Sequence, residues 1–220
     1  MKTSNKILIA TAIIIVVGLF LQSYILRNAY QKALLNPKSQ FVKFDLKEPK
    51  SLNIKHHWNV KFKKADKFYI EIFKEYKDSL KYNYVGDSLN LDGRNAGEMI
   101  INTANLPKLT FDSEKGSELY VYINEFFNSS LLDVQFIKAC HFTIIGSQFE
   151  RAKIKSNESL QLILENCDIK NLNLNLPKRS EITLNYSKIG SKNFNLGDSC
   201  SVKVTGNYPG AIPGQYFGYK

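Results

Sequence analysis

The residues best suited to acid–base or metal chemistry in this chain are few and scattered. Its three histidines are His56, His57 and His141. His56 and His57 are adjacent, so in a strand they point to opposite faces and cannot serve one site. His141 lies between Cys140 and Phe142, which we expect to point inward, and it should therefore face outward. The histidines predict neither a catalytic centre nor a metal site.

Glycoside hydrolysis needs a pair of carboxylates on one face. Among the outward strand positions we find one acid, Glu181, without a partner. Glu165 and Asp168 fall at a corner, which is typical of solvated turn residues. There is no Gly-rich phosphate loop and no nucleophile motif. We therefore predict a protein that is not an enzyme and has no catalytic residues, metal or cofactor; the alternative is a carbohydrate-active enzyme on a β-helix scaffold.

The three cysteines form no CxxC motif for metal or redox chemistry. Cys140 and Cys200 share a column of the repeat described below but lie three coils apart, roughly 14 Å by strand spacing. Cys167 falls in a corner column with Ser147 and Ser187. Because a disulfide needs Cα atoms within about 7 Å, we predict three unpaired and mostly buried thiols that pack as small apolar residues.

Exposed aromatic residues are the better indication of binding. Tyr120 and Tyr122 alternate with inward residues, and Phe126 and Phe127 follow in the turn. A cluster of outward aromatic side chains can stack on sugars or bury in a partner. We predict these four as ligand-binding residues; the alternative is that the N-terminal strands cover them.

Asparagines gather near the end of the chain. We interpret them as outward strand and turn residues whose amides bond between coils, with a sugar-binding amide surface as the alternative: Asn171, Asn173, Asn175, Asn185, Asn193 and Asn195.

The charge balance favours anionic neighbours. The 220 residues include 30 Lys and Arg against 20 Asp and Glu, a net charge of +10. Such a surface suits phospholipid, nucleic acid or acidic glycans, or is simply a solvated basic face. The partners we predict are the membrane and a glycan or an envelope protein, and we predict no nucleic acid partner.

An uncharged apolar run from Ile7 to Leu26 precedes the polar part of the chain. Twenty helical residues span about 30 Å, the hydrocarbon thickness of a bilayer. Tyr24 and Arg27 stand at its far edge, where interfacial anchors belong. A cleaved signal peptide would have a shorter apolar region and a small-x-small cleavage site. We therefore predict an uncleaved transmembrane helix.

Basic residues are nearly balanced across this predicted helix, with Lys2 and Lys6 before it and Arg27, Lys32 and Lys38 after it. Because a single N-terminal anchor before a β-rich domain usually leaves its short end in the cytoplasm, we place residues 27–220 outside it, in the periplasm or at the cell surface. The few cytoplasmic residues argue against a third hypothesis, a regulatory subunit that signals across the membrane. We predict that residues 29–40 form a spacer, whose helical part ends at Pro37.

From residue 41 onward, short runs alternate between apolar and polar residues, which predicts half-buried strands. After Leu106 the pattern repeats in steps of 21, 20, 20 and 20 residues. The first inward column is Val121, Phe142, Leu162, Ile182 and Val202. The second is Ile123, Ile144, Leu164, Leu184 and Val204. A corner column is Phe149, Ile169 and Ile189.

A second series lies between these strands, and its last step suggests an insertion of two residues: Leu132/Val134, Ala152/Ile154, Leu172/Leu174 and Phe194/Leu196. A fixed period near 20 with two strands per period is typical of a solenoid. One coil alone cannot bury its inner face, so like residues must stack, each contributing roughly 1.5–3 kcal/mol of burial. We predict an all-β, right-handed parallel β-helix; an antiparallel sandwich is the alternative.

The segment "FVKFDLKEPKSLNIKHHWNVKFKKADKFYIEI", followed by "LKYNYVGDSLNLDG" and the repeats, resembles the GIN-domain family. This family is described as candidate auto-transporter adhesin head domains and is common in Bacteroidetes-like bacteria. The resemblance covers about residues 41–205 and implies a β-helix-like head outside the cytoplasm without established enzyme activity. The small Gly-Ser-Gly-like turns of such domains are mostly replaced here by "GSQFER", "ENCDIK" and "NYSKIG".

The predicted organisation has four parts. Residues 1–28 form the membrane anchor, 29–40 the spacer, 41–205 the solenoid and 206–220 a C-terminal cap or tail. Because an open solenoid end exposes unpaired strand groups, the cap residues we expect are Tyr208, Ile212, Tyr216 and Phe217. The predicted function is a non-enzymatic, membrane-anchored scaffold for binding, adhesion or envelope organisation.

Overall fold

The computed structural model describes residues 17–28, 40–56, 59–93, 97–113, 119–177 and 179–206. Residues 17–28 form a helix with exposed side chains. Residues 7–16 of the predicted anchor lie outside the described residues, as do 29–39 of the spacer and 207–220 of the predicted cap. Within the described ranges, no helix is both long and apolar enough to cross a bilayer.

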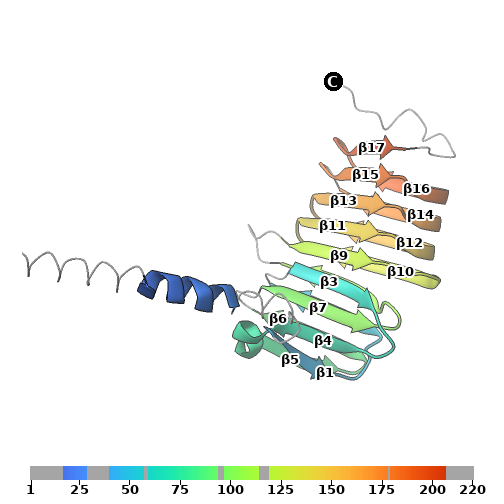
Figure 1. Ribbon diagram of the computed structural model, residues 1–220. Coiled ribbons are helices and arrows are strands. Elements are labelled where there is room, and N and C mark those ends of the chain that lie inside the picture. Colours follow the sequence, from blue (N-terminus) through green and yellow to red (C-terminus); the bar gives the residue numbers. More distant parts are fainter. Residues whose placement is uncertain are drawn as a thin grey trace, which may run out of the picture. The chain divides into compact units, whose positions relative to one another are not determined.

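Strands make up most of the rest of the described chain, which we call the β-domain (residues 41–206; Figure 1). The elements are β1 (Phe41–Asp45), β2 (Ser51–Lys55), β3 (Asn59–Lys64), β4 (Tyr69–Phe73), the 3-10 helix η2 (Lys74–Ser79), β5 (Leu80–Val85), β6 (Ser88–Gly93), β7 (Glu98–Thr103), β8 (Lys108–Asp112), β9 (Tyr120–Asn124), β10 (Ser129–Phe136), β11 (Cys140–Ile145), β12 (Gln148–Ser156), β13 (Leu160–Glu165), β14 (Asp168–Leu176), β15 (Glu181–Asn185), β16 (Lys188–Leu196) and β17 (Ser201–Thr205).

The strands form two sheets. Sheet A has the order β1-β4-β7-β3-β9-β11-β13-β15-β17, and sheet B has the order β16-β14-β12-β10-β8-β2-β6-β5. From β8 onward, each coil is one strand of sheet B followed by one strand of sheet A, and the described strands of this part pair in parallel. This arrangement is compatible with a β-solenoid and excludes an antiparallel sandwich for residues 108–205.

The inward columns predicted from the repeat are in register. Phe142 pairs with both Val121 and Leu162, and Ile182 continues the column to Val202. Ile123, Ile144, Leu164, Leu184 and Val204 form the second predicted column. Phe149, Ile169 and Ile189 form the predicted corner column. The first column is at most 5% exposed, so the stacking that the period predicts is confirmed.

The predicted insertion of two residues in the last step is wrong. Leu172 pairs with Lys192, Leu174 with Phe194, and Leu176 with Leu196, so the step stays at 20 residues. Lys192 therefore occupies the position that Ala152 and Leu172 fill in earlier coils. Lys192 is tolerated there because β16 is the end strand of sheet B. At this end of the sheet the inward positions Lys192, Phe194 and Leu196 are only partly buried.

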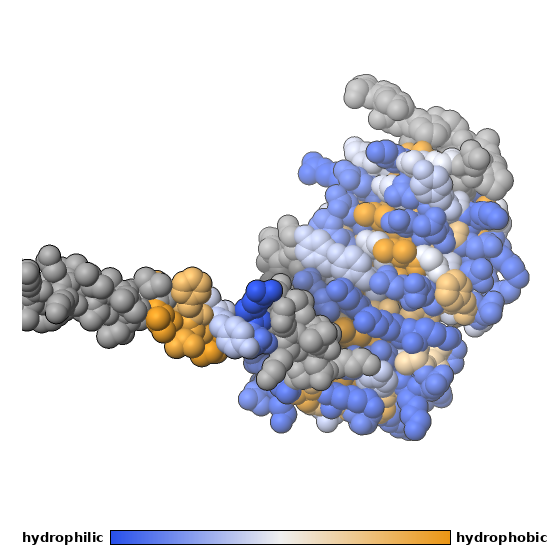
Figure 2. Space-filling view, viewed as in Figure 1, coloured by the Kyte–Doolittle hydropathy of each residue, from blue (hydrophilic) through white to orange (hydrophobic). Residues whose placement is uncertain are grey.

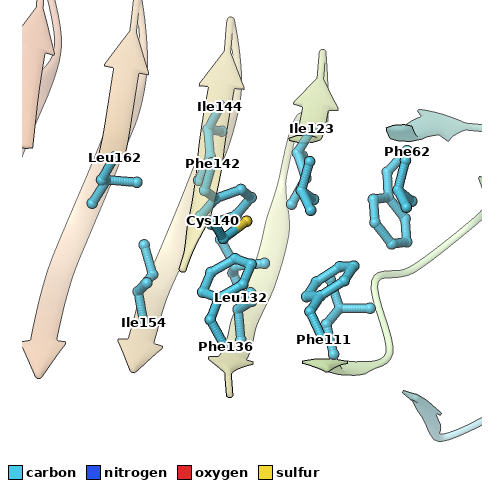
Figure 3. Close-up of a cluster of buried hydrophobic side chains, with 14 of the residues drawn as sticks. Phe62, Phe111, Ile123, Leu132, Phe136, Cys140, Phe142, Ile144, Ile154 and Leu162 are labelled. Carbon is cyan, nitrogen blue, oxygen red and sulfur yellow. The ribbon is translucent and has the colours of Figure 1, made fainter. Parts of the chain in front are cut away.

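Aromatic rings fill the core where the repeat begins. Phe111 stacks on Phe136 with ring centroids 5.2 Å apart, and Phe136 meets Phe142 at 5.1 Å (Figure 3). Phe62 of β3 contacts Phe111 edge-on at 6.4 Å. These rings are fully buried and join the two sheets.

The strands before β8 do not stack in chain order. The coil of β2 and β3 lies against that of β8 and β9, and the coil of β6 and β7 lies beyond it, all parallel. β4 and β5 then pair antiparallel with β7 and β6. The alternation from residue 41 onward predicted strands in this part, but it indicated neither their order nor this antiparallel end.

From β9 onward, the tight corner after each sheet A strand holds one residue in the left-handed region. These residues recur at the period of the coil: Glu125 (φ 59°), Gly146 (57°), Asn166 (52°), Tyr186 (50°) and Gly206 (94°). The amides of the first four corner residues donate to the next coil, as Gly146 does to the carbonyl of Glu165 at 2.9 Å. Glycine and asparagine adopt this conformation at low cost. Because these left-handed residues recur once in every coil, they fix the length of the coil as well as the direction in which the chain turns.

In three of these corners the residue after the left-handed position is small, namely Ser147, Cys167 and Ser187, and it hydrogen-bonds to buried backbone groups, whereas Phe126 follows Glu125. The amide of Cys167 donates to Ser187 Oγ at 3.1 Å, and the Ser187 hydroxyl donates to the carbonyl of Leu164 at 3.1 Å. Ser147 accepts in the same way from the amide of Phe126 at 3.1 Å. The column Ser147, Cys167 and Ser187 predicted from the sequence is therefore a hydrogen-bonded ladder.

Stacked columns imply that inward and outward residues of one strand differ sharply in their effect on stability. In β13, Leu162 is buried and Ile163 faces out. We expect Leu162→Ala to lower the free energy of unfolding by about 2–5 kcal/mol, and Ile163→Ala by less than about 1 kcal/mol. Denaturant unfolding of the full chain measures both values, and equal losses would contradict the assigned register.

Candidate functional site

The outer face of sheet A carries two of the four aromatic residues predicted to bind a ligand. Tyr120 and Tyr122 are half-buried on the outward side of β9. Phe126 is fully buried in the core, so its prediction as an exposed residue is wrong. The left-handed turn at Glu125 reverses the expected alternation and turns the Phe126 ring inward. Phe127 is 52% exposed but follows the far end of β9 and lies outside this site.

Tyr120 is stacked on a histidine of the next coil. The rings of Tyr120 and His141 are 4.6 Å apart and nearly parallel, with an interplanar angle of 11°. The two residues are opposite each other in the parallel register of β9 and β11. His141 faces outward as predicted, and its ring extends the aromatic surface over two coils.

Two shallow hollows border this stacked pair. One is lined by Asn59, Lys61, Glu98, Tyr120 and Tyr122. The other is lined by Ala139, Cys140, His141, Ser159, Leu160, Gln161, Arg179 and Glu181. Figure 2 shows a largely hydrophilic face of the β-domain with small separate apolar patches. We call Tyr120, Tyr122, His141 and the first hollow the aromatic site.

The polar rim of the aromatic site comes from residues that the sequence did not indicate. Asn59 of β3 is opposite Tyr120, and Lys61 is opposite Tyr122. Lys61 Nζ lies 2.5 Å from Glu98 Oε2 of β7, which fixes both side chains at the edge of the hollow. No repeat in the sequence placed β3 beside β9, so the sequence did not indicate this rim.

The acidic residues on this face do not form an acid–base pair among the described residues. Glu181 Oε2 accepts a hydrogen bond from Gln161 Nε2 at 3.2 Å, which holds it as a surface carboxylate. Glu165 ends β13 and Asp168 begins β14, at the corner where the sequence placed them. Within the described ranges, no cluster of three or more His, Cys, Asp or Glu side chains could hold a metal ion.

The histidine of the N-terminal part belongs to a different surface. His56 Nδ1 lies 2.6 Å from Asp92 Oδ1, and its backbone is in the left-handed region at φ 69°. His57 lies outside the described residues. His56 follows β2 in sheet B, whereas His141 belongs to β11 in sheet A, so these two histidines do not share a site.

The cysteines are free thiols with different surroundings. Cys140 and Cys167 are buried, as predicted, whereas Cys200 is partly exposed near the end of the stack. Burial raises the pKa of the Cys140 thiol well above its ordinary value, and it also raises the pKa of Cys167. Both thiols donate to backbone carbonyls, Cys140 to Leu119 at 3.3 Å and Cys167 to Ile144 at 3.3 Å. They therefore act as protonated packing groups, and neither is an activated nucleophile.

Three of the six late asparagines, Asn171, Asn175 and Asn195, bond between coils as predicted. Asn195 Nδ2 donates to Asn175 Oδ1 at 3.1 Å, and Asn171 Nδ2 donates to the carbonyl of Glu150 at 3.2 Å. Asn173 pairs with Asn193 in the register of β14 and β16. These bonds tie neighbouring strands on the outer face of sheet B.

Comparison with known proteins does not identify a family or a function for this chain. No family model matches the chain, and no curated protein matches it, so the resemblance to the GIN-domain family is not confirmed. A crystal structure of a putative adhesin from Parabacteroides merdae is similar over 76% of this chain and 95% of its own. The identity is 10% and the TM-score 0.28, too low to support a functional argument.

The burial of the cysteines predicts their reactivity. With native protein near neutral pH, we expect a thiol reagent to modify Cys200 first and Cys140 and Cys167 only on unfolding. Burial raises the pKa of these two thiols above the ordinary 9.0. Above that pH the thiols ionise more readily in the unfolded chain than in the folded one, so the free energy of unfolding falls as the pH rises. Below that pH both states keep their thiols protonated, and the full stability is retained. Mass spectrometry of alkylated protein tests the order, and rapid labelling of Cys167 would contradict it.

Proposed function

We propose that this chain is a non-enzymatic, membrane-anchored, right-handed β-solenoid of the GIN-domain type. It displays a binding surface outside the cytoplasm, in the periplasm or at the cell surface, for adhesion or envelope organisation. The aromatic site on sheet A is the surface that we propose for recognition, and its ligand is a glycan or an envelope protein.

The stacked Tyr120–His141 pair is the observation that carries this proposal. Aromatic rings bring a large apolar area together with polar edges, which suits the alternating CH and OH faces of sugars or a protein partner. The hollow beside Tyr120 has an amide, a cation and a carboxylate on its rim, from Asn59, Lys61 and Glu98. These groups can orient hydroxyls while the rings supply contact area.

A rigid backbone supports this surface. Tyr120 and Tyr122 alternate with Val121 and Ile123, both fully buried, so packing of the core fixes where the outer rings point. Preorganised side chains lose less conformational entropy when a ligand binds. The register of β3, β9 and β11 therefore positions the site without any loop in the described part of it.

The carbohydrate-active enzyme is the competing hypothesis, and Glu181 is its candidate residue. Glu181 accepts a hydrogen bond from Gln161, and the hollow beside it supplies Arg179 but no second carboxylate among its described lining residues. Hydrolysis needs a general acid and a second carboxylate on opposite sides of the bond. A glycan panel that showed turnover lost in Glu181→Gln would favour the enzyme and overturn our proposal.

Removal of the aromatic site should abolish ligand binding without unfolding the domain. We expect Tyr120→Ala combined with Tyr122→Ala to weaken binding to an uncharged glycan or an envelope-component hit from an array by at least about tenfold, a loss of roughly 1.4 kcal/mol. Phe127→Ala is the matched control, since Phe127 is exposed but distant along the chain from the site. Equal loss in the control, or unchanged binding in the double variant, would contradict the assignment.

The proposed anchor makes a separate prediction. We expect the full chain to remain in the membrane fraction after carbonate extraction, and deletion of residues 7–26 to release it. External protease should digest the β-domain in intact spheroplasts if residues 27–220 face outward. Recovery of the intact full chain in the soluble fraction would contradict the anchor, and cleavage near residue 26 would favour a signal peptide.

A further inference from the structure

The outer face of sheet B carries three parallel rows of polar side chains. The row on β12 is cationic and consists of Arg151, Lys153 and Lys155. The rows on β14 and β16 are Asn171, Asn173, Asn175, Ser191, Asn193 and Asn195. The register places Arg151 opposite Asn171, Lys153 opposite Asn173, and Lys155 opposite Asn175, with the β16 row next. We call these nine residues the cation–amide face.

The cations of this face are not neutralised by neighbours. Within the described residues, none of Arg151, Lys153 and Lys155 forms a salt bridge. Glu150, beside Arg151, is committed to Lys170, with Lys170 Nζ 2.5 Å from Glu150 Oε1. This pairing lowers the pKa of Glu150 and keeps it ionised.

One carboxylate does belong to the surroundings of the cationic row. Asp133 of β10 is opposite Lys153 in the register and is half-buried. Leu131 and Gln135, on either side of Asp133, bring no charge. Three cations thus share one nearby carboxylate that is free of an ion pair among the described residues, and the row retains a net positive charge.

Two of the three cross-strand pairs of this face between β14 and β16 are held by side-chain hydrogen bonds among the described residues, and the pair between them is not. Asn175 accepts from Asn195 at 3.1 Å, and Asn171 accepts from the hydroxyl of Ser191. Between them, Asn173 and Asn193 make no side-chain hydrogen bond to the described residues, and both are exposed. Their donors and acceptors are therefore available to a ligand on a flat, rigid surface.

Spacing and chemistry select the ligand class. Alternate side chains on a strand are about 6.8 Å apart, and neighbouring strands are about 4.8 Å apart. Cations at this spacing match repeated acidic groups along an extended chain, and amides beside them match hydroxyls. We propose that the cation–amide face binds an acidic polysaccharide, with Arg151, Lys153 and Lys155 pairing with its carboxylate or sulfate groups and Asn173 and Asn193 with its hydroxyls.

Other anionic partners fit this face less well. Single-stranded nucleic acid is held by aromatic side chains on which bases stack, and none of the nine residues is aromatic. A lipid surface is bound by apolar side chains inserted beside basic ones, and the nine residues include no apolar side chain. An extended acidic polymer requires neither feature. This site is separate from the aromatic site, because it lies on the other sheet.

The test is binding of the purified full chain in detergent to heparin and polygalacturonate, with neutral dextran as the reference. We expect the triple variant Arg151→Gln, Lys153→Gln and Lys155→Gln to bind at least about tenfold more weakly, with a shallower dependence on salt. Asn173→Ala with Asn193→Ala should weaken binding severalfold and leave the salt dependence unchanged. Thermal unfolding of each variant confirms that it is folded.

A matched control separates a site from general charge. Lys67→Gln, Lys74→Gln and Lys77→Gln remove three exposed cations from the N-terminal part of the β-domain and should leave affinity nearly unchanged. The triple variant should still bind an uncharged glycan held by the aromatic site, so failure of the aromatic site and failure of this site are distinguishable. If the triple variant is poorly folded, Lys153→Glu tests the row alone. Equal losses in the control, unaltered binding, or tighter binding of an oligonucleotide or anionic vesicle through the same row would overturn the proposal.

Discussion

The structure depends on one constraint: the inner face of each coil is buried only if the next coil presents the same positions in the same register. Val121, Phe142, Leu162, Ile182 and Val202 meet this condition without a slip. A shift of one residue would send every inward side chain of a strand to solvent. Coil length is therefore held near 20 residues by the burial of the core, and every other feature of the β-domain must accommodate it.

The corners show how that length is maintained. Three of the tight turns combine a left-handed residue with a small hydrogen-bonding one after it, as in Gly146–Ser147 and Asn166–Cys167. Cysteine can replace serine because its thiol also donates to the turn carbonyls. Tyr186 is the costly member, since a bulky residue in this conformation is strained. Its ring lies so close to Gly206 that a side chain there would clash at 2.5 Å, so this corner is specified by two coils together.

The regular coils could be predicted from the sequence because their contacts repeat at a fixed separation. The period gave the columns and the outward position of Tyr120 and His141. The period failed where it is broken or absent: Lys192 on an inward position suggested an insertion that does not exist. The β2–β8 pairing joins Leu52 to Leu109, a separation that no internal repeat encodes. The rim of the aromatic site was missed for this reason, and Phe126 was misplaced because the left-handed Glu125 changes the face of the residue that follows.

The same constraint explains why binding surfaces are expected on the sheets of this fold. Inward positions must match the coil above and below, but outward positions only need to stay soluble and tolerate their neighbours. Register then converts single outward residues into ladders, so that His141 meets Tyr120 on sheet A and the amide of Asn195 meets Asn175 on sheet B. The two faces differ in chemistry because they are free to vary independently, one aromatic and one cationic, while a shared core keeps both rigid. The recognition that we propose would therefore depend on rows of side chains across strands, and its specificity would change through outward substitutions that leave the core untouched.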